Sequence, residues 1–462
     1  MPIVTRLYVP DDFGVAQVLF SITGIIVVVS SLRYELAIVL PEKDEDAINI
    51  VALSSIIVFN ISIIILILIG LFRSSIARLF DLPELISFIW FVPVIILLGG
   101  VYNILQNWSS RRQYFGLIGL SGIYTKITDS SFKLGAGALA NPGPFGLIGA
   151  QILGSIVGTI VLFNKHRKFA LDIFKKNVSF TGIKNNAQKY RRFPIYDSWS
   201  GLLNSASSNL PIVLLAFFFS SNIVGYFALS MRVLIYPLDI LWNSISKVFY
   251  QKAASEKNQY GSTTYVVEAV YKRLFAFGLF PMLCLVILGK DLFEIVFGAR
   301  WIESGVYIQY LAPWLFLRFI SSPLSTILLI EDKQKQLLYF NIASFISRLV
   351  VIIVVGYFGD PRTTILFYAL TSALLYLLLM FYILILSNVS VNNIIRYITS
   401  SVIYCILFLI LLFITLSINL KPIVPIIIAI FMGAIYYLLL LKKDSYIKDV
   451  INGMIQTKRD NY

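Results

Sequence analysis

The chain has 462 residues, of which 58% are hydrophobic and only 13% carry a charge. This composition excludes a soluble globular protein and indicates a chain that crosses a membrane many times. A helix needs roughly 20 apolar residues to cross the ~30 Å hydrocarbon core. Barrel strands would be about ten residues long and strictly alternating, a pattern that the apolar runs of this chain lack. The predicted fold class is therefore all-α, a polytopic bundle of about thirteen transmembrane helices.

The predicted spans follow one another with mostly short connections. They lie near residues 13–39, 47–69, 85–106, 114–139, 144–163, 192–219, 223–248, 270–289, 303–330, 337–357, 362–386, 397–417 and 422–441. The formal net charge of +14 could suggest a nucleic-acid partner, so the positions of the charges matter. Alternating the spans puts about 25 basic residues on one side and about seven on the other, and the richer side is cytoplasmic by the positive-inside rule. The basic balance thus reflects topology, with the C-terminus in the cytoplasm and no nucleic acid bound.

The first predicted span ends in a charged pair at the cytoplasmic rim. Arg33 and Glu35 lie about two turns before the acidic loop 42–46. One interpretation is an interfacial ion pair that anchors the helix end. The other is a cytoplasmic gate that opens during transport.

The span 114–139 carries a polar stripe. Lys126, Asp129 and Lys133 are spaced i, i+3 and i+7 and so share one helical face. An ionisable residue at mid-membrane normally faces a bundle interior or a watery cavity. We expect this helix to line such a cavity, with Asp129 as the candidate ion-coupling carboxylate. An ion pair of Asp129 with Lys126 or Lys133 would explain the acid equally well.

A basic polar segment, residues 164–190, separates two groups of spans and is predicted to be a cytoplasmic linker. It either binds anionic lipid headgroups through its lysines and arginines or only sets topology and tethers the two parts. The predicted division is an N-terminal transmembrane lobe (1–163), this linker, a C-terminal lobe (191–386), and two further helices with a cytoplasmic tail (387–462).

The start of the second lobe carries a recognisable sequence. It reads FPIY, then LLNSASSNLPIVLLAFFFSSNIVGYFALSMRVLIYP and KVFYQKAAS, and near the N-terminus the chain reads TRLYVPDDFGVAQVLF and RYELAIVLPEKDEDA. Two motifs in this order resemble the bacterial polysaccharide flippases, the oligosaccharide-exporting branch of the multidrug/oligosaccharidyl-lipid/polysaccharide (MOP) superfamily. The resemblance implies two lobes, residence in the bacterial cytoplasmic membrane, and a substrate of undecaprenyl-diphosphate-linked oligosaccharide. Membrane lipids, a polysaccharide polymerase and chain-length machinery are the other partners implied.

An internal comparison aligns FGVAQVLF with VGYFALSM and so pairs Gly14 with Gly225. A full span precedes Gly225, but only thirteen residues precede Gly14. The resemblance implies fourteen helices with both ends in the cytoplasm, so we expect the first of them to be missing here. Either the start codon is assigned too late or the protein is shortened.

Four cations are predicted near the membrane midplane when ~1.5 Å per residue is counted from the span ends. They are Lys126, Arg232, Arg318 and Arg348, and Asp129 is the one acid placed at similar depth. This cationic surplus predicts a central cavity that receives an anion, because such groups make charge-assisted contacts to a diphosphate or to acidic sugars.

No catalytic, cofactor or metal site is predicted. Cys284 and Cys405 fall inside spans, and His166 stands alone in the basic linker, where we expect it to be solvated. The external loops carry no paired carboxylates, Ser/His arrangement or phosphate-binding glycine loop, so an enzyme is not expected.

The function predicted from these features is a flippase for lipid-linked oligosaccharides, working by alternating access for surface polysaccharide biosynthesis. Two alternatives stay open. A flippase for a peptidoglycan lipid precursor shares the chemistry, and an ion-coupled drug extruder of the same superfamily would be expected to show an acidic surplus instead.

Overall fold

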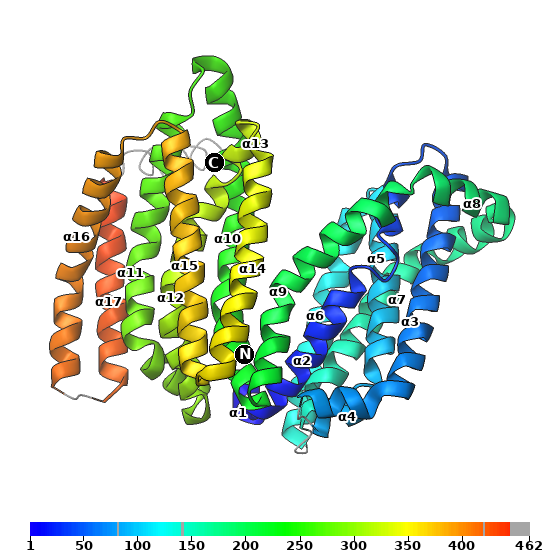
Figure 1. The fold of residues 1–462 in the computed structure, drawn as a ribbon, viewed down its shortest axis with the longest axis horizontal. Coiled ribbons are helices and arrows are strands. Elements are labelled where there is room, and N and C mark those ends of the chain that lie inside the picture. Colours follow the sequence, from blue (N-terminus) through cyan, green and yellow to red (C-terminus); the bar gives the residue numbers. More distant parts are fainter. Residues whose placement is uncertain (81–82, 140–142, 419–420, 444–462) are drawn as a thin grey trace, which may run out of the picture. The chain divides into compact units, whose positions relative to one another are not determined.

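The fold is helical throughout the part of the chain that the computed structural model describes, residues 1–80, 83–139, 143–418 and 421–443 (Figure 1). No strand occurs among these residues, so the all-α prediction is confirmed. Within these described ranges, ten helices are long and apolar enough to cross a membrane. The other predicted spans, 114–139, 223–248 and 270–289, fall on three further long helices that carry charged residues along their length.

The chain divides into two compact units, Met1–Ala228 and Leu229–Tyr462. The first unit contains α1 (Val4–Leu7), α2 (Pro10–Val27), η1 (Tyr34–Val39), α3 (Asp44–Phe80), α4 (Pro83–Phe88), α5 (Phe91–Arg111), α6 (Phe115–Leu139), α7 (Pro144–Asn177), α8 (Phe180–Lys189), η2 (Phe193–Asp197), α9 (Ser198–Phe218) and the beginning of α10 (Ser221–Tyr260). The second contains the rest of α10, α11 (Thr264–Phe297), η3 (Ala299–Trp301), α12 (Ile302–Leu324), α13 (Ile327–Ile330), α14 (Gln334–Phe358), α15 (Pro361–Leu386), α16 (Val391–Ser417) and α17 (Ile423–Lys443). The α9 helix packs against α2 inside the first unit. The predicted division into functional lobes at residue 191 stays a prediction.

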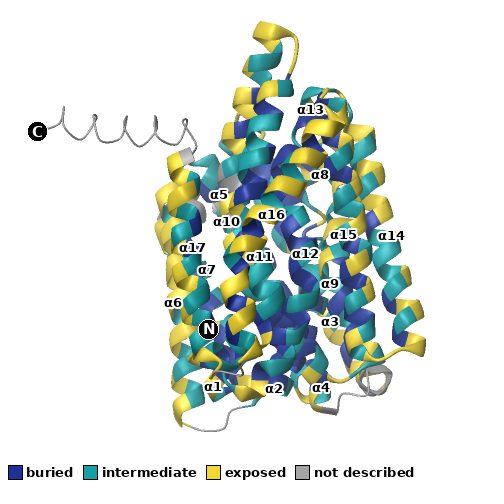
Figure 2. Cartoon of the chain, turned by 90° about the vertical axis from the view of Figure 1, so that its left-hand side faces the viewer, coloured by how far each residue is buried: buried dark blue, intermediate teal, exposed yellow. Residues whose placement is uncertain are grey.

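Many large apolar side chains lie on the outside of the helices. On α14 alone Leu338, Ile342, Ile346 and Val350 are exposed (Figure 2). In water such a surface would be unfavourable, but against lipid chains it costs nothing. The exposed apolar faces therefore agree with the multi-pass membrane protein predicted from the composition.

The first predicted span, 13–39, is wrong in its extent. The helix α2 ends at Val27, and Leu32 and Arg33 have positive φ angles of 50° and 62°. The Ser30 hydroxyl donates to the Val27 carbonyl at 2.8 Å, which is an alternative to the next helical hydrogen bond. The chain then turns and continues as the short helix η1.

The predicted linker, 164–190, is more structured than its polar composition suggested. Helix α7 continues to Asn177, and α8 occupies Phe180–Lys189. The break lies at residues 178–179 and not at Gly182, whose backbone N–H donates to the capping Ser179 hydroxyl. Asn49 of α3 bonds both sides of this break, because its side chain donates to the Asn177 carbonyl and accepts from the Ser179 N–H.

The two glycines paired by the internal comparison meet at a close crossing of α2 with the beginning of α10. A Cβ atom on Gly14 would overlap the carbonyl oxygen of Ser221, and one on Gly225 would overlap the carbonyl oxygen of Pro10. Each glycine thus faces the residue four positions before the other glycine. The side chain of Ser221 also donates a short hydrogen bond to Asp11. The repeat visible in the sequence is a reciprocal backbone contact in the structure.

Candidate functional site

The second unit contains an arginine whose guanidinium group is surrounded by aromatic rings. Arg348 on α14 lies 5.0 Å from the ring centre of Trp314, 5.8 Å from that of Tyr376 and 5.9 Å from that of Tyr368. Its Nε donates to the Ser372 hydroxyl at 2.9 Å. Its Nη2 is buried and has no hydrogen-bond partner among the described residues, and the same holds for the indole nitrogen of Trp314. We call these five residues the aromatic box.

A second arginine of this unit lies on the neighbouring helix α12. Arg318 forms an ion pair of 3.7 Å with Asp239 of α10, and its guanidinium lies 5.9 Å from the centre of the Trp242 ring. These three residues line one small pocket with Leu315 and Ser322. At 3.7 Å, with the Asp239 side chain 42% exposed, solvent screening makes this ion pair a weak one.

The two arginines belong to one local cluster. Arg348 faces Trp314, and Trp314 lies one helical turn before Arg318 on α12. The third predicted cation of this unit, Arg232, is half-buried on α10. It precedes Asp239 by two turns and shares its helical face.

The sequence analysis did not include Asp239 in this cluster, because it counted Asp129 as the one acid at the depth of the four cations. The ion pair shows that Asp239 lies beside Arg318. The seven-residue spacing from Arg232 was the signal that could have identified it.

The remaining predicted cation, Lys126, belongs to the first unit, where it is exposed on α6. The same helix carries the ion pair between Asp129 and Lys133, whose charged atoms are 2.7 Å apart. An ion pair with Lys126 or Lys133 was the alternative explanation for Asp129 in the sequence analysis. The ion-coupling role of Asp129 stays a prediction. That all four cations line one central cavity also stays a prediction.

Arg33 and Glu35 lie together at the beginning of η1. Their charged atoms are 3.7 Å apart, and Glu35 also accepts a short hydrogen bond from Ser31. Burial raises the pKa of the Glu35 carboxyl, although the Ser31 hydroxyl and the Arg33 charge act in the opposite direction. Arg33 packs over Gly201, where an added Cβ would lie 3.3 Å from its Nε. The predicted ion pair is present, and its service as a gate stays a prediction.

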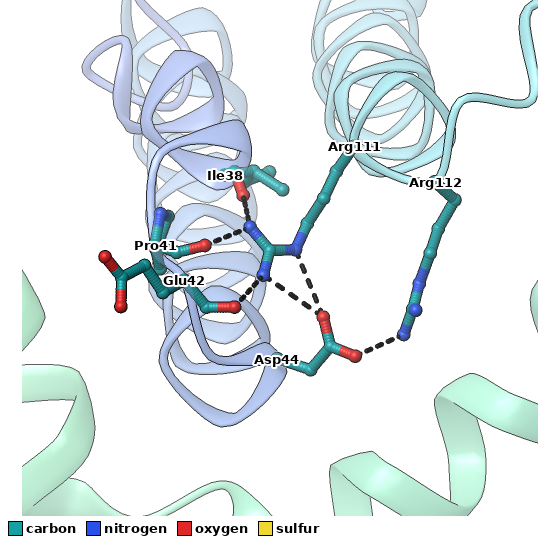
Figure 3. Close-up of polar contacts among 6 residues, drawn as sticks. All are labelled: Ile38, Pro41, Glu42, Asp44, Arg111 and Arg112. Carbon is teal, nitrogen blue, oxygen red and sulfur yellow. Dashed lines mark hydrogen bonds and ion pairs between the residues drawn. The ribbon is translucent and has the colours of Figure 1, made fainter.

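A stronger ionic cluster than this pair joins the end of α5 to the segment before α3 (Figure 3). Arg111 donates to the carbonyl oxygens of Ile38, Pro41 and Glu42, and twice to one carboxylate oxygen of Asp44. Arg112 binds the other oxygen of Asp44 at 2.7 Å. We call these residues the Arg111 clamp.

The Arg111 clamp was not predicted, since Arg111 and Arg112 entered the sequence analysis only as topology signals. The sequence did contain an indication of this cluster: the acidic run 42–46 and the pair Arg111 and Arg112 are both predicted on the cytoplasmic side. With five hydrogen bonds to fixed acceptors, the Arg111 guanidinium has no donor left for a ligand.

The expectation that His166 is solvated is wrong. His166 is 3% exposed, its Nε2 lies 2.9 Å from the Ser109 hydroxyl, and its ring stacks on Tyr114 at 5.7 Å. The helix α7 continues beyond the predicted span, so this histidine lies on a helix and packs against α5.

Among the residues that the structure describes, no group of three or more His, Cys, Asp and Glu side chains lies close enough to hold a metal ion. The chemistry available in the second unit is instead that of arginine, tyrosine and tryptophan donors around a partly neutralised positive charge.

Two solved transporter structures resemble this fold. The lipid II flippase MurJ in an inward closed conformation matches with a TM-score of 0.66 and 15% identity, over 94% of this chain and 97% of the other. An inward-facing multidrug resistance MATE family transporter of the MOP superfamily matches with a TM-score of 0.61 and 13% identity, over 83% of this chain and 94% of the other. At such low identity the likeness shows the fold alone, which is that of a multi-pass membrane transporter.

The family is shown by the sequence itself. A family of polysaccharide biosynthesis proteins matches residues 3–306, which is more than half of the chain, so this protein belongs to it. The expected relation to polysaccharide biosynthesis proteins is confirmed, and the fold agrees with that of the MOP superfamily transporter described above. No curated protein sequence matches the chain.

Proposed function

We propose that this protein flips oligosaccharides linked to undecaprenyl diphosphate from the cytoplasmic to the external leaflet of the bacterial cytoplasmic membrane. It would do so by alternating access, supplying units for a surface polysaccharide. The family membership and the transporter fold support this proposal. The C-terminus would lie in the cytoplasm, as the positive-inside rule indicates.

The observation that carries the proposal is the cluster of Arg318, Arg348 and Asp239 in the second unit. Arg348 faces Trp314, one helical turn from Arg318 on α12, and the acid beside Arg318 lies at the long ion-pair distance of 3.7 Å. A positive charge inside a membrane is costly unless an anion or water compensates it. A diphosphate supplies that compensation, and arginine binds phosphate oxygens through paired N–H donors.

Within this proposal the residues have different parts. Arg318 contacts the anion, and Trp242 beside it stacks on a sugar ring. The Nη2 of Arg348 donates to the substrate when the substrate is present. Arg232 and Lys126 add positive charge, Asp129 couples transport to an ion gradient, and the pair of Arg33 with Glu35 is the cytoplasmic gate.

The test is complementation of a strain that lacks its own polysaccharide flippase, scored by polysaccharide at the cell surface. Single alanine substitutions of Arg232, Arg318 and Arg348 should lower export by about 10- to 100-fold, and lysine substitutions should retain part of it. Arg362→Ala is the matched control, because Arg362 is an arginine of the same unit whose two donors already bind Glu303 at 2.7 Å. Full export by all three alanine variants, at normal membrane abundance, would contradict the proposal.

A second candidate is a flippase for a peptidoglycan lipid precursor, favoured by the likeness to the MurJ fold. Its substrate would also present a diphosphate to the same arginines. Rescue of a strain depleted of its lipid II flippase, without rescue of polysaccharide export, would select this candidate. A drug extruder is the third possibility, and protection from cationic drugs in a sensitised strain would select it.

A further inference from the structure

The pocket at Arg318 contains one cation and one acid and has almost no empty space. Arg318 and Asp239 are the two charged residues of its lining, and most of the other lining side chains are apolar. Its volume of about 10 Å³ corresponds to roughly one water molecule. A phosphate group is several times larger than a water molecule, so it does not fit while both charged side chains keep their positions.

Asp239 faces the nitrogen of Arg318 that a phosphate needs most. A guanidinium group binds an oxyanion through one of two pairs of N–H groups, Nε with Nη2 or Nη1 with Nη2. Nη2 belongs to both pairs, and this atom of Arg318 lies 3.7 Å from the Asp239 carboxylate. Arg362 in the same unit shows one such pair, since its Nε and Nη2 each donate to Glu303 at 2.7 Å. A phosphate bound in this way at Arg318 takes the place of Asp239.

The ion pair of Asp239 with Arg318 is weak enough to be exchanged. Its charged atoms are 3.7 Å apart, too far for a hydrogen bond, and the Asp239 side chain is 42% exposed. Exposed ion pairs contribute little to stability. Among the residues that the structure describes, neither partner makes another ion pair. The carboxylate can therefore leave Arg318 when a diphosphate, which carries more negative charge, arrives.

An arginine inside a membrane needs a counter-ion in both halves of a transport cycle. A positive charge there is costly unless an anion or water compensates it. The diphosphate of the substrate supplies the compensation in the loaded protein, but the protein returns without it. Asp239 lies beside Arg318 and is placed to supply the compensation after the substrate has left.

We propose that Asp239 and the diphosphate of the substrate alternate at Arg318, so that Asp239 is the internal counter-ion of the empty protein and promotes release of the anion. This inference rests on the proposed function and adds to it a residue that lowers the affinity for the substrate. A bound anion is also repelled by Asp239, because like charges attract no partner and repel one another across a short distance. Arg318 and Asp239 thus act in opposite directions on binding, although export needs both.

Binding is measured by isothermal titration calorimetry on the purified full chain, with farnesyl diphosphate as the probe. Asp239→Asn removes the carboxylate charge with little change of shape, and it should bind the probe about 10-fold more tightly than the wild type does. Arg318→Ala should bind the probe about 10- to 100-fold more weakly. The matched control is Asp332→Asn, which removes an exposed acid of the same unit that does not line the pocket, and it should bind as the wild type does.

Export and thermal unfolding separate an exchanging carboxylate from a structural one. Asp239→Asn should lower export about 10-fold despite its tighter binding, because tighter binding arises mostly from slower release. Asp239→Glu keeps the charge and should restore part of the export. The melting temperature of Asp239→Asn should stay close to that of the wild type, since the exposed pair contributes little to stability. A joint loss of binding and melting temperature would make Asp239 a structural residue and overturn the proposal.

Three further results would overturn the proposal. The first is binding of the probe by Asp239→Asn that is no tighter than in the wild type, including no binding by either. The second is equally tight binding in the Asp332→Asn control, which would mean a diffuse effect of net charge. The third is wild-type export by Asp239→Asn. Failure of the wild type itself to restore polysaccharide export, with the binding contrast intact, would contradict the proposed function and still support the exchange at Arg318.

Discussion

Two half-buried arginines, Arg111 in the first unit and Arg348 in the second, have opposite surroundings. Arg111 donates all its N–H groups to three backbone carbonyls and one carboxylate (Figure 3). Arg348 makes one hydrogen bond, to a serine, and otherwise faces three aromatic rings.

The difference indicates how the two residues are used. A guanidinium bound to fixed acceptors holds those acceptors in place, so its loss leaves several polar groups unsatisfied. A guanidinium stabilised by ring faces keeps its charge and a donor available for a ligand that comes and goes. The first arrangement suits stability, and the second suits binding.

The largest expected effect, and the sharpest test of this contrast, is at Arg348. Arg348→Ala should lower export by about 10- to 100-fold, because a charge-assisted contact to the substrate is lost. Membrane abundance should change little. Export measured against abundance checks this, with Arg348→Lys expected to retain part of the activity. A fall in abundance that fully accounts for the fall in export would make Arg348 a structural residue like Arg111.

The opposite pattern is expected at Arg111. Arg111→Ala should lower the free energy of unfolding by about 3 kcal/mol, since three carbonyls and Asp44 lose their donor. Thermal unfolding of the purified protein in detergent measures the loss. Arg111→Lys should recover only a small part, because a single ammonium group cannot reach all the acceptors. If Arg111→Ala melts at the wild-type temperature but exports poorly, Arg111 acts in transport and not in stability, and the contrast with Arg348 is wrong.

At the crossing of α2 and α10 the two glycines meet backbone carbonyls and no arginine, so this contact tests whether the contrast concerns charge or rigidity. Gly225→Ala should cost about 2 kcal/mol, because the added methyl group meets the backbone carbonyl of Pro10. Gly14→Ala should cost a similar amount. Gly122→Ala is the matched control: this helical glycine has nothing within 4 Å of a Cβ atom, so alanine should be neutral or stabilising. Equal melting temperatures of Gly225→Ala and Gly122→Ala would contradict the close crossing.

The smallest effect is expected at an exposed cap in the second unit. Asp360 caps α15, and hydrogen bonds from the Thr363 N–H and hydroxyl hold the pKa of its carboxyl below the usual value. Its contribution to stability is therefore present above the unfolded-state pKa, about 3.9, and is lost as the pH falls through the lower folded-state pKa.

Asp360→Ala should cost about 0.5–1 kcal/mol at pH 7. Asp360→Asn keeps the cap without a titrating group, so the wild type should lose stability relative to Asp360→Asn on going from pH 6 to pH 3. Thermal unfolding at the two pH values checks this sign. An unchanged difference between the two proteins would mean that the carboxylate charge plays no part in the cap.

Hydropathy alone predicted the fold class, because about 20 apolar residues in a row have few stable conformations other than a membrane helix. It could not place the end of α2, where a serine side chain competes with the helix for a carbonyl oxygen. His166 was misplaced for a related reason. Its neighbours in the chain are polar, but its contacts, Ser109 and Tyr114, come from a distant part of the sequence.

The sequence by itself determined the class of protein, its family and the positions of the candidate cations, since each depends on residue type and spacing along the chain. Only the tertiary structure decided which of those cations are neutralised. Arg111 meets its acceptors about seventy residues earlier in the chain, and Arg348 meets Trp314 on a different helix. Electrostatic and hydrogen-bond energies fall steeply with distance, so the part that a charge plays depends on which distant side chains the folding of the chain brings beside it.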